Sequence, residues 1–257
     1  MEPIRYCALI RTFNSQRTLP ATIASLAGQS VPPVHYVAVD SGSTDATFDC
    51  LPADTTLHRF RGRTFNYSDA INQGLAFVET DYVLVISSHT SLLNPGAIAY
   101  ALDLLASRND IGAAYFCSEG GDALDHVLID RRNFDGFNGV WNTCGLYKMA
   151  LLRRRAFRPE VFSAEDQEWS RWLLEEQNLS VARILGGRMS YNALDYPTEK
   201  TLKENLAIAL FVRPDMLRLP YLLRTLYRIV RPVSTMRNRR MHARLLFHFL
   251  YHRFVSP

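Results

Sequence analysis

The sequence has few cysteines, and no two of them stand at the spacing of a metal or redox motif. Cys7, Cys50, Cys117 and Cys144 are spread over a chain of 257 residues. Scattered cysteines of this kind argue against a disulfide framework, and they favour buried thiols in a reducing compartment. We therefore do not expect a small secreted domain held together by disulfides.

Long apolar segments and an N-terminal leader are also missing. No uncharged apolar run approaches the roughly 20 residues that a membrane-spanning helix needs. The first residues, Met-Glu-Pro-Ile-Arg-Tyr, lack a basic stretch followed by an apolar run, so we expect no secretory signal. The cytoplasm is the expected location.

Acidic and basic residues are unevenly divided along the chain. After residue 212 the sequence has ten arginines and one acid, which leaves 19 basic and 24 acidic residues before that point. The net charge is therefore about −5 over residues 1–212 and about +9 over residues 213–257. This split predicts a catalytic or binding domain over 1–212 and a basic tail over 213–257 that suits an anionic surface.

Strand patterns and helix patterns alternate along the first part of the chain. Short apolar runs predict strands at 6–12, 34–39, 56–60, 81–86, 112–117 and 179–184. Helical spacing of apolar residues predicts helices at 19–27, 66–79, 95–106, 146–154 and 165–177. This alternation is typical of an α/β fold with a mostly parallel central sheet and helices on both faces. In such a sheet, ligands bind at the carboxyl ends of the strands.

The segment Val39-Asp-Ser-Gly-Ser-Thr-Asp45 follows one of the predicted strands. Its exposed backbone N–H groups suit an anion, and the carboxylate of Asp40 suits ribose hydroxyls or a base amide. The alternative is a capped helix start, with Ser43 or Thr44 as the cap and Asp45 in the first turn. Turn chemistry explains Ser43 to Asp45 adequately, and Asp40 less well.

A second candidate is the segment Ser163-Ala-Glu-Asp-Gln-Glu-Trp169. Its adjacent carboxylates, Glu165 and Asp166, could supply the general base that removes a proton from an attacking hydroxyl. However, Ser163 followed by Asp166 three residues later also fits a capping box at a helix start. The spacing favours the two interpretations equally.

The third candidate is Ser87-Ser88-His89, directly after the clearest predicted strand. His89 could bind a metal ion as neutral imidazole or a phosphate as imidazolium. A lone histidine is more often a hydrogen-bonded structural residue, and no cysteine or carboxylate lies at metal-site spacing. The residues alone therefore favour a structural role for His89.

Arg59, Arg61 and Arg63 surround a glycine after the third predicted strand. Arginine pairs bidentately with phosphate, so a contact with a diphosphate is one interpretation. A solvated basic loop is at least as good an explanation.

Taken in order, these segments resemble a known family. The pieces are Ile10-Arg-Thr-Phe-Asn14, Leu26-Ala-Gly-Gln29, Val39-Asp-Ser-Gly-Ser-Thr-Asp-Ala-Thr47, Asn72-Gln-Gly74, Asp81-Tyr-Val-Leu-Val85, Asn94-Pro-Gly96 and Glu165-Asp-Gln-Glu-Trp169. From about residue 4 to 176 the chain resembles the family-2 inverting glycosyltransferases with the GT-A fold, particularly bacterial enzymes that build surface polysaccharides such as lipopolysaccharide. The resemblance implies attack by an acceptor hydroxyl on the anomeric carbon of a nucleoside-diphosphate sugar.

The resemblance also implies roles by position. Asp166 would be the general base, with Glu165 beside it, and Asp40 would contact the nucleoside. The donor site would comprise Thr12, Asn14, Asp40, Ser43, Asp45, Arg61, Arg63, Asn72, Ser88 and His89. The acceptor side would comprise Asn142, Tyr147 and Trp169. The implied partners are the sugar nucleotide and a glycan or lipid-linked acceptor.

One departure from the family pattern concerns the metal. The family usually carries Asp-x-Asp where this chain has Ser87-Ser88-His89, and Tyr191-Asn192-Ala193 stands where a later histidine often completes the site. The hard oxygen ligands that suit Mg²⁺ or Mn²⁺ are thereby lost. Either His89 binds a metal, or His89 and arginines such as Arg61 or Arg63 neutralise the diphosphate without one. We expect weak or absent metal dependence.

The basic tail predicts two amphipathic helices. In residues 216–231 the spacing aligns Arg224, Arg228 and Arg231, and after Pro232 it aligns Arg237, Arg240, Arg244 and His248. Helices of this kind lie on anionic membranes. The tail therefore predicts peripheral contact with the inner membrane, and the alternative is that the helices pack their apolar faces on the body. The basic tail alone does not indicate a nucleic-acid partner, because the body is acidic.

A protein that binds nucleotide sugars but has lost catalysis is the alternative function. The altered Asp-x-Asp position favours this alternative, whereas the intact Glu165-Asp166 pair opposes it.

Overall fold

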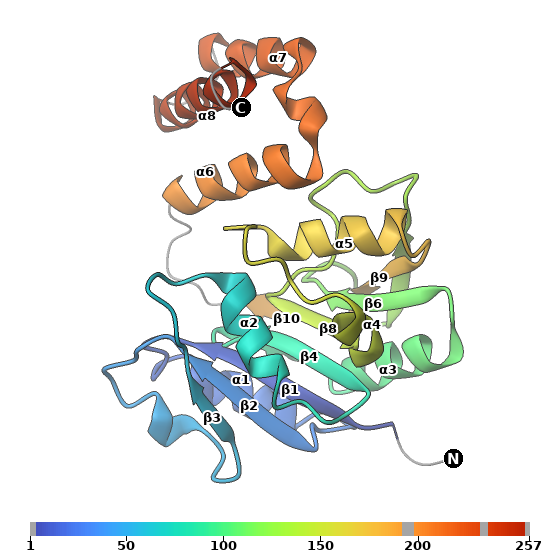
Figure 1. Ribbon diagram of the computed structural model, residues 1–257. Helices are drawn as coiled ribbons and strands as arrows, with labels where there is room; N and C mark the ends of the chain where they lie inside the picture. The colour runs from blue at the N-terminus through green and yellow to red at the C-terminus, as the bar shows by residue number, and fades with distance from the viewer. Residues whose placement is uncertain (1–3, 192–197, 232–235, 255–257) are drawn as a thin grey trace.

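The computed structural model describes residues 4–191, 198–231 and 236–254. Its centre is a sheet of eight strands in the order β3-β2-β1-β4-β8-β6-β9-β7 (Figure 1). The strands are β1 (Tyr6–Thr12), β2 (His35–Asp40), β3 (Thr56–Arg59), β4 (Tyr82–Ser87), β6 (Ile111–Phe116), β7 (Asp125–Ile129), β8 (Cys144–Lys148) and β9 (Ser180–Leu185). A small second sheet pairs β5 (Thr90–Leu92) with β10 (Met189–Tyr191).

The strands β3, β2, β1 and β4 run parallel to one another. Their carboxyl ends therefore lie at one edge, where Thr12 is in register with Asp40 and Arg11 with Ser87. Strand β8 is antiparallel to both β4 and β6, β6 is parallel to β9, and β7 is antiparallel to β9. The predicted α/β architecture with a largely parallel sheet is confirmed.

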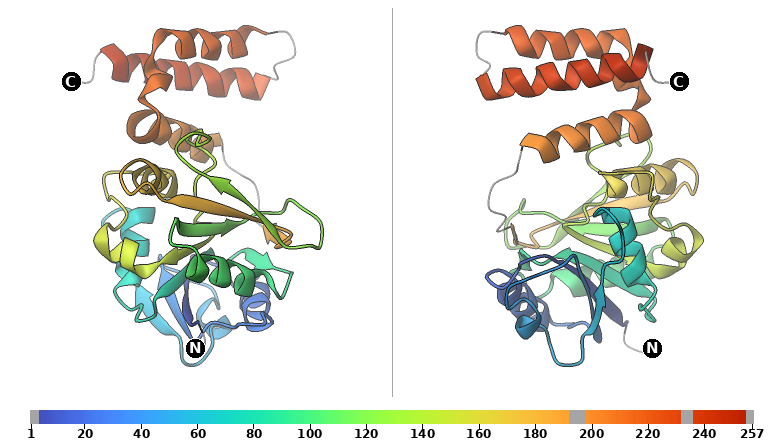
Figure 2. Two further views of the ribbon diagram at one scale, coloured as in Figure 1. Left: turned by 90° about the vertical axis from the view of Figure 1, so that its right-hand side faces the viewer. Right: turned by 60° about the vertical axis from the view of Figure 1, so that its left-hand side comes forward.

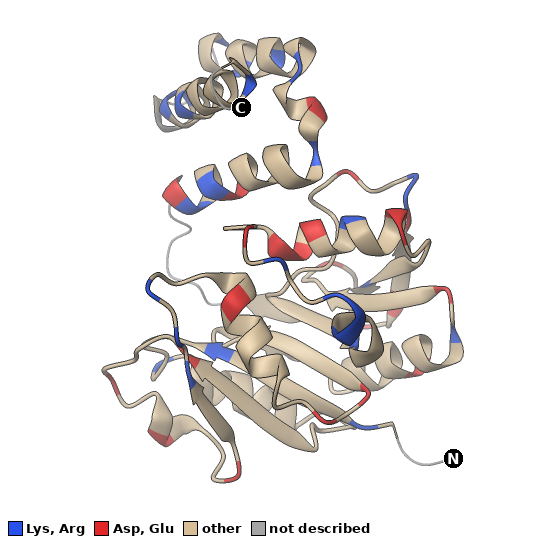
Figure 3. Cartoon of the chain, viewed as in Figure 1, with Lys and Arg blue, Asp and Glu red and all other residues tan. Residues whose placement is uncertain are grey.

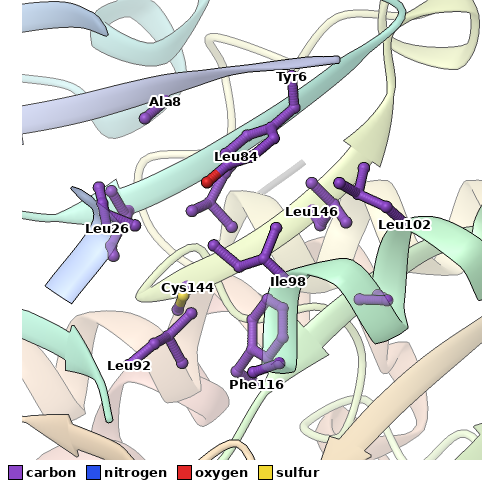
Figure 4. Packing of buried hydrophobic residues seen from close by; sticks show 14 of the residues in the cluster. Tyr6, Ala8, Leu26, Leu84, Leu92, Ile98, Leu102, Phe116, Cys144 and Leu146 are labelled. Carbon is purple, nitrogen blue, oxygen red and sulfur yellow. The ribbon is translucent and has the colours of Figure 1, made fainter. Parts of the chain in front are cut away.

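Helices cover both faces of the sheet, because successive side chains of a strand point to opposite sides. The helices of this part are α1 (Leu19–Ala27), α2 (Tyr67–Leu75), α3 (Ala97–Ser107), α4 (Met149–Arg154) and α5 (Glu165–Glu175). In β1, the side chains of Tyr6, Ala8 and Ile10 pack with α1 and α3, whereas Cys7 and Leu9 belong to a second core with α2, α4 and α5. Figure 4 shows the first core, in which residues of β1, β4 and β8 lie against α1 and α3.

The structure corrects two of the predicted helices. Residues 144–148 are not helical but form strand β8, and only Met149–Arg154 is helix. The reason is tertiary, because β8 lies between β4 and β6 and is buried on both faces, so that Leu146 and Tyr147 pack into different cores. The helix predicted at 66–79 ends at Leu75.

The remaining helices form a separate layer above α5 (Figure 1 and Figure 2). They are α6 (Thr198–Ala207), a π-turn over Ile208–Val212, a 3₁₀ turn over Pro214–Leu217, α7 (Leu219–Val230) and α8 (Met236–Phe254). A third core joins α6 and the π-turn to α7 and α8, and it includes Ala164 at the start of α5. This core therefore contains residues from both sides of position 212, and the division into 1–212 and 213–257 stays a prediction.

Helix α2 holds the segment that leads into α5. Three of its side chains bind the backbone of that segment: Asn66 Nδ2 donates to the Pro159 carbonyl, Ser68 Oγ to the Val161 carbonyl and Asn72 Nδ2 to the Phe157 carbonyl. The Asn72 Oδ1 also accepts from the Phe157 N–H at 3.1 Å. These bonds fix the approach of the chain to α5 and so place the first turn of that helix.

We expect Asn72→Ala to lower the free energy of unfolding by about 1–3 kcal/mol, because the N–H and the carbonyl of Phe157 both lose their partner. Gln73→Ala is the matched control on the same helix, since the Gln73 bonds to the Arg61 backbone are solvent-exposed. Urea unfolding of the two variants measures the difference. Equal midpoints would contradict the clamping role of Asn72.

Candidate functional site

Two adjoining cavities open at the carboxyl ends of β1, β2 and β4. The larger has a volume of about 940 Å³ and the smaller of about 380 Å³, and both are lined by Ser41 and Phe65. Residues of β1, β4, α5 and α6 line the larger cavity. The loops after β2 and β3 line the smaller one.

The loop after β2 is organised by Asp40, which is 1% exposed. Its Oδ1 accepts from the backbone N–H groups of Gly42 and Ser43, at 2.9 and 2.8 Å. Its Oδ2 accepts from the hydroxyls of Thr12, at 2.9 Å, and Ser43. No helix begins at Ser43 or Thr44, so the capped-helix alternative is wrong; a loop leads instead to a short 3₁₀ turn.

The loop after β1 is hydrogen-bonded to the same segment. Asn14 has a left-handed backbone with φ of 47°, its N–H donates to Ser43 Oγ, and its Oδ1 accepts from the Thr44 N–H. Asp45 accepts from the Gln16 N–H and from Thr47. The predicted residues Thr12, Asn14, Ser43 and Asp45 therefore lie together with Asp40.

The basic residues after β3 divide into two groups. Arg59 and Arg63 line the smaller cavity with Asp40, and the Arg59 guanidinium lies 5.4 Å from the ring centroid of Phe48. Arg61 is exposed and does not line the cavity, and its backbone binds the Gln73 amide. Of the two arginines predicted for the donor site, Arg63 lines the smaller cavity and Arg61 does not, and their contacts with a donor stay predictions.

Asn72 lies outside both cavities. Its side-chain amide is hydrogen-bonded at both atoms to the backbone of Phe157. The prediction that Asn72 contacts the nucleotide therefore finds no support in the ligand-free geometry.

Helix α5 begins at Glu165 without a side-chain cap. Its N-cap residue is Ala164, which has a left-handed backbone with φ of 56°. The capping-box interpretation of Ser163 and Asp166 is therefore wrong. Instead, two of the three acidic side chains of the first turn, Glu165 and Asp166, line the larger cavity, and Figure 3 shows this acidic start of α5.

The carboxylate of Asp166 is half-buried, and both of its oxygens accept hydrogen bonds. Oδ2 accepts from the Asn142 N–H at 2.9 Å, and Oδ1 from the Gln167 N–H at 2.8 Å. Burial, and next the negative charge of Glu165, raise the pKa of Asp166 to about 7. This carboxyl group can therefore gain or lose a proton near neutral pH, as a general base must.

Asn142 links the acidic pair to the strand layer. Its Nδ2 donates to Glu165 Oε1 at 2.9 Å, and its Oδ1 accepts from the Tyr147 hydroxyl at 2.6 Å. Tyr147 and Trp169 are fully buried in the second core and do not line the cavity. The prediction that these two residues contact an acceptor is therefore wrong, whereas Asn142 does line the cavity.

The segment Ser87-Ser88-His89 lies in the larger cavity as predicted. Ser87 Oγ accepts from the Arg11 guanidinium at 3.0 Å, and Ser88 Oγ lies 2.7 Å from Ser15 Oγ. Burial, and next Arg11 and Lys200, lower the pKa of His89 to about 4. The imidazole is therefore neutral at pH 7 unless a neighbouring anion raises this pKa, and phosphate binding by an imidazolium stays a prediction.

These three residues do not fit a divalent cation. A positively charged guanidinium already donates to Ser87, and neutral hydroxyls are poor substitutes for the anionic oxygens that Mg²⁺ or Mn²⁺ prefers. Within residues 4–191, 198–231 and 236–254, no group of three histidine, cysteine or acidic side chains is placed to hold a metal. The predicted replacement of a histidine by Asn192-Ala193 lies outside the described residues.

Among the cavity residues that the sequence reasoning missed, three lie in one cluster. Arg11 was read as part of a motif without a role, and Tyr67 and Lys200 were not considered. The guanidinium of Arg11 lies 5.3 Å from the ring centroid of Tyr67, and Lys200 Nζ lies 5.9 Å from it. An arginine inside the apolar strand Tyr6–Thr12 was the available signal, because charged residues are rarely buried without a function.

Solved structures with a similar fold include TarS, a mannosyltransferase and a glucosyl-3-phosphoglycerate synthase. TarS of S. aureus has a TM-score of 0.56 at 16% identity, covering 98% of this chain but 44% of TarS. A mannosyltransferase of Pyrobaculum calidifontis in complex with GDP-Man and Mn²⁺ has 0.61 at 16%, covering 98% and 76%. The glucosyl-3-phosphoglycerate synthase of Mycobacterium tuberculosis, with Mn²⁺, UDP and phosphoglyceric acid, has 0.64 at 16%, covering 82% and 78%.

These similarities show the fold, and the predicted GT-A architecture is confirmed. No curated protein matches the sequence. The sequence pattern described as Glycosyl transferase family 2 matches residues 7–159, which is more than half of the chain. The edge of the sheet that carries Asp40 and Ser87 lies inside this match, and the chain belongs to glycosyl transferase family 2.

Proposed function

We propose that the protein is an inverting glycosyltransferase with Asp166 as its general base. It transfers a hexosyl or deoxyhexosyl group from a nucleoside-diphosphate sugar to a hydroxyl of a glycan or lipid-linked acceptor, in the synthesis of a bacterial surface polysaccharide. The observation that carries the proposal is the carboxylate of Asp166, whose pKa is about 7 and which faces the larger of two adjoining cavities.

The smaller cavity suits the nucleoside part of the donor. Arg63 and the rigid Asp40 loop line it, together with Phe48 and Phe60, so it offers a cation, polar groups and aromatic rings. The two cavities share Ser41 and Phe65 as lining residues, so a donor bound in the smaller one could extend its sugar past them toward Asp166. The solved relatives support this use, since TarS has been crystallised with UDP-GlcNAc and the mannosyltransferase with GDP-Man.

The acceptor would enter on the side of the larger cavity that is lined by Phe137 and Trp141. These rings lie beside the acidic start of α5, and Trp141 Nε1 donates to the Phe137 carbonyl at 3.1 Å. Aromatic faces stack on sugar rings, so this wall suits a glycan.

In the proposed reaction, the ionised Asp166 accepts the proton of the acceptor hydroxyl. The acceptor oxygen forms a bond to the anomeric carbon as the bond from that carbon to the diphosphate oxygen breaks. The nucleoside diphosphate leaves with the electron pair, and attack opposite to the leaving group inverts the configuration. The N–H groups of Asn142 and Gln167 hold the carboxylate in place, one on each oxygen.

The tail supports contact with an anionic membrane in this function. Exposed apolar side chains follow one side of α7, at Leu219, Leu223, Leu226, Tyr227 and Val230, and one side of α8, at Phe247, Leu250, Tyr251 and Phe254. The alternative was that the tail helices pack their apolar faces on the rest of the protein. It holds for part of this surface, because Leu245 and Phe249 are buried in the third core. The side chain of Arg237 lies outside the described residues.

Not every tail arginine is available to lipid. Arg244 pairs with Glu199 of α6, and Arg253 donates to the Leu217 carbonyl. Arg224, by contrast, is exposed, and Arg228, one turn further along α7, is partly exposed. No helix in the described part of the chain combines the length and the apolar character that crossing a bilayer requires. We therefore propose that the protein binds the inner membrane at its surface.

Asp166→Asn should lower sugar transfer by about 10²–10⁴-fold, because a general base contributes a factor of this size. Nucleotide affinity should stay unchanged. A screen of nucleoside-diphosphate sugars identifies the donor, and product formation and titration calorimetry measure the two quantities. Glu160→Gln, an exposed acid before α5, is the control. A wild-type protein that binds a sugar nucleotide but transfers nothing would favour the inactive binding protein instead.

The rate should also depend on pH with a defined sign. Because Asp166 acts ionised, kcat/KM should rise about tenfold per pH unit below pH 7 and level off above it. Glu165→Gln removes a negative charge that raises the pKa of Asp166, so the rising limb should move to lower pH. If kcat/KM of this variant rises over the same pH range as that of the wild type, the assignment of Asp166 as the general base is wrong.

Membrane contact predicts separable effects of charge and apolar surface. Phe247→Ser with Phe254→Ser should weaken binding to vesicles with and without anionic lipid, since both rings are largely exposed and available for insertion. Arg224→Gln should weaken only binding to anionic vesicles, by about fivefold for a contribution near 1 kcal/mol. Leu93→Ser, an exposed site on the body, is the control. Unchanged flotation of the tail variants would disprove the contact.

A further inference from the structure

The groups around Ser87 are neutral or cationic, so they do not hold a metal ion that could neutralise the charge of a donor diphosphate. Ser87 Oγ and the carbonyl of Asn142 both accept from Arg11 Nη2, at 3.0 and 2.7 Å. The hydroxyl of Ser88 is engaged with Ser15, and the imidazole of His89 stacks edge-to-face on Tyr191 with a centroid distance of 4.8 Å. The positive charge at this point of the cavity is therefore supplied by the protein.

Arg11 is a half-buried cation whose known partners are all neutral. No acidic side chain forms an ion pair with it, because within the described part of the chain no carboxylate oxygen lies within 4.0 Å of its guanidinium. Its Nε is buried and has no hydrogen-bond partner among those residues. Holding a partly buried cation with a buried, unpartnered N–H and no anionic partner costs free energy, so Arg11 is suited to an anionic ligand.

A second cation comes to the same place from a distant part of the chain. Lys200 belongs to α6 and lines the same cavity, and its Nζ lies 5.9 Å from the ring centroid of Tyr67, which also carries Arg11 at 5.3 Å. The carboxylate of Glu204 is 3.9 Å away, at the limit of an ion pair. The lowered pKa of His89 has the same two cations among its causes.

Two cations held on one aromatic ring repel each other, and the Glu204 carboxylate, 3.9 Å from Lys200 Nζ, can offset only one of the two charges. The ring of Tyr67 attracts both cations, but each such contact contributes only about 0.5–2 kcal/mol. A ligand with two or more negative charges would relieve this repulsion. In a cavity that shares Ser41 and Phe65 with the proposed nucleoside cavity, a diphosphate has the right charge and position.

We propose that Arg11 and Lys200, held by Tyr67, form a cationic site that binds the donor diphosphate and stabilises the leaving nucleoside diphosphate in place of a divalent ion. This inference rests on the proposed function. It assigns the charge-neutralising role to residues of β1 and α6, and Arg61 has no part in it. It also gives α6 a function, because this helix brings Lys200 over the edge of the sheet where β1 and β4 end.

The test is diphosphate binding by titration calorimetry in EDTA. UDP, GDP, dTDP, CDP and ADP are screened on the wild-type protein, and the tightest is then compared with its unphosphorylated nucleoside. Arg11→Gln and Lys200→Gln should each weaken the diphosphate about tenfold or more and leave the nucleoside within about twofold, since a charged hydrogen bond contributes on this scale. In turnover, both variants should lose kcat more than they raise KM for the acceptor.

Matched controls separate the site from general charge effects. Lys203→Gln removes the same charge from the exposed side of α6, and Arg5→Gln does so before the opposite end of β1. Both should bind the diphosphate as the wild type does. Arg11→Lys keeps the charge, and it tests the site even where Arg11→Gln lowers the melting temperature. Tyr67→Phe should keep the diphosphate affinity, whereas Tyr67→Leu should reduce it.

The outcomes distinguish the two proposals. If no nucleoside diphosphate or its sugar binds or reacts with the wild-type protein, the proposed function fails and the cationic site with it. If the protein transfers a sugar but Arg11→Gln, Arg11→Lys and Lys200→Gln all bind the diphosphate like the wild type, the cationic site alone is wrong. The same conclusion follows if binding and turnover vanish in EDTA and return with Mn²⁺.

Discussion

The arrangement of the site depends on the hydrogen bonds of Asn142. Its backbone N–H binds Asp166, its side-chain amide binds Glu165 and the Tyr147 hydroxyl, and its carbonyl binds Arg11. One residue at the entrance to β8 thereby ties the acidic start of α5 to the cationic end of β1. Because opposite charges are held apart on one neutral amide residue, neither neutralises the other, and both remain available to a ligand.

This separation of charge explains why the cavity has two kinds of chemistry. On the α5 side, burial and an adjacent carboxylate raise the pKa of Asp166, which favours proton transfer near neutral pH. On the β4 side, burial, and next the cations Arg11 and Lys200, lower the pKa of His89, so the positive charge rests on Arg11 and Lys200. A transferase needs such an asymmetry, since it takes a proton at one end of the reacting group and receives negative charge at the other.

Local residues predicted most of the sheet and part of the site. Alternating apolar runs indicated the strands from β1 to β4, and the order of motifs indicated the Asp40 loop and the Glu165-Asp166 pair. The capping-box interpretation of Asp166 could be rejected only from the tertiary structure, because Ser163 fits a capping box in sequence while Ala164 is the actual N-cap. Trp169 and Tyr147 were misassigned for a similar reason, since a pattern of aromatic residues does not reveal which of them face the core.

The sequence by itself determined the α/β layering, the family and the presence of a basic C-terminal tail, because these depend on period, local turn chemistry and composition. Only the tertiary structure decided that residues 144–148 form a central strand. It also decided that Arg11 and Lys200 both lie against the ring of Tyr67. Those contacts join positions far apart in the chain, and their energy comes from burial and long-range electrostatics, which no local pattern of residues encodes.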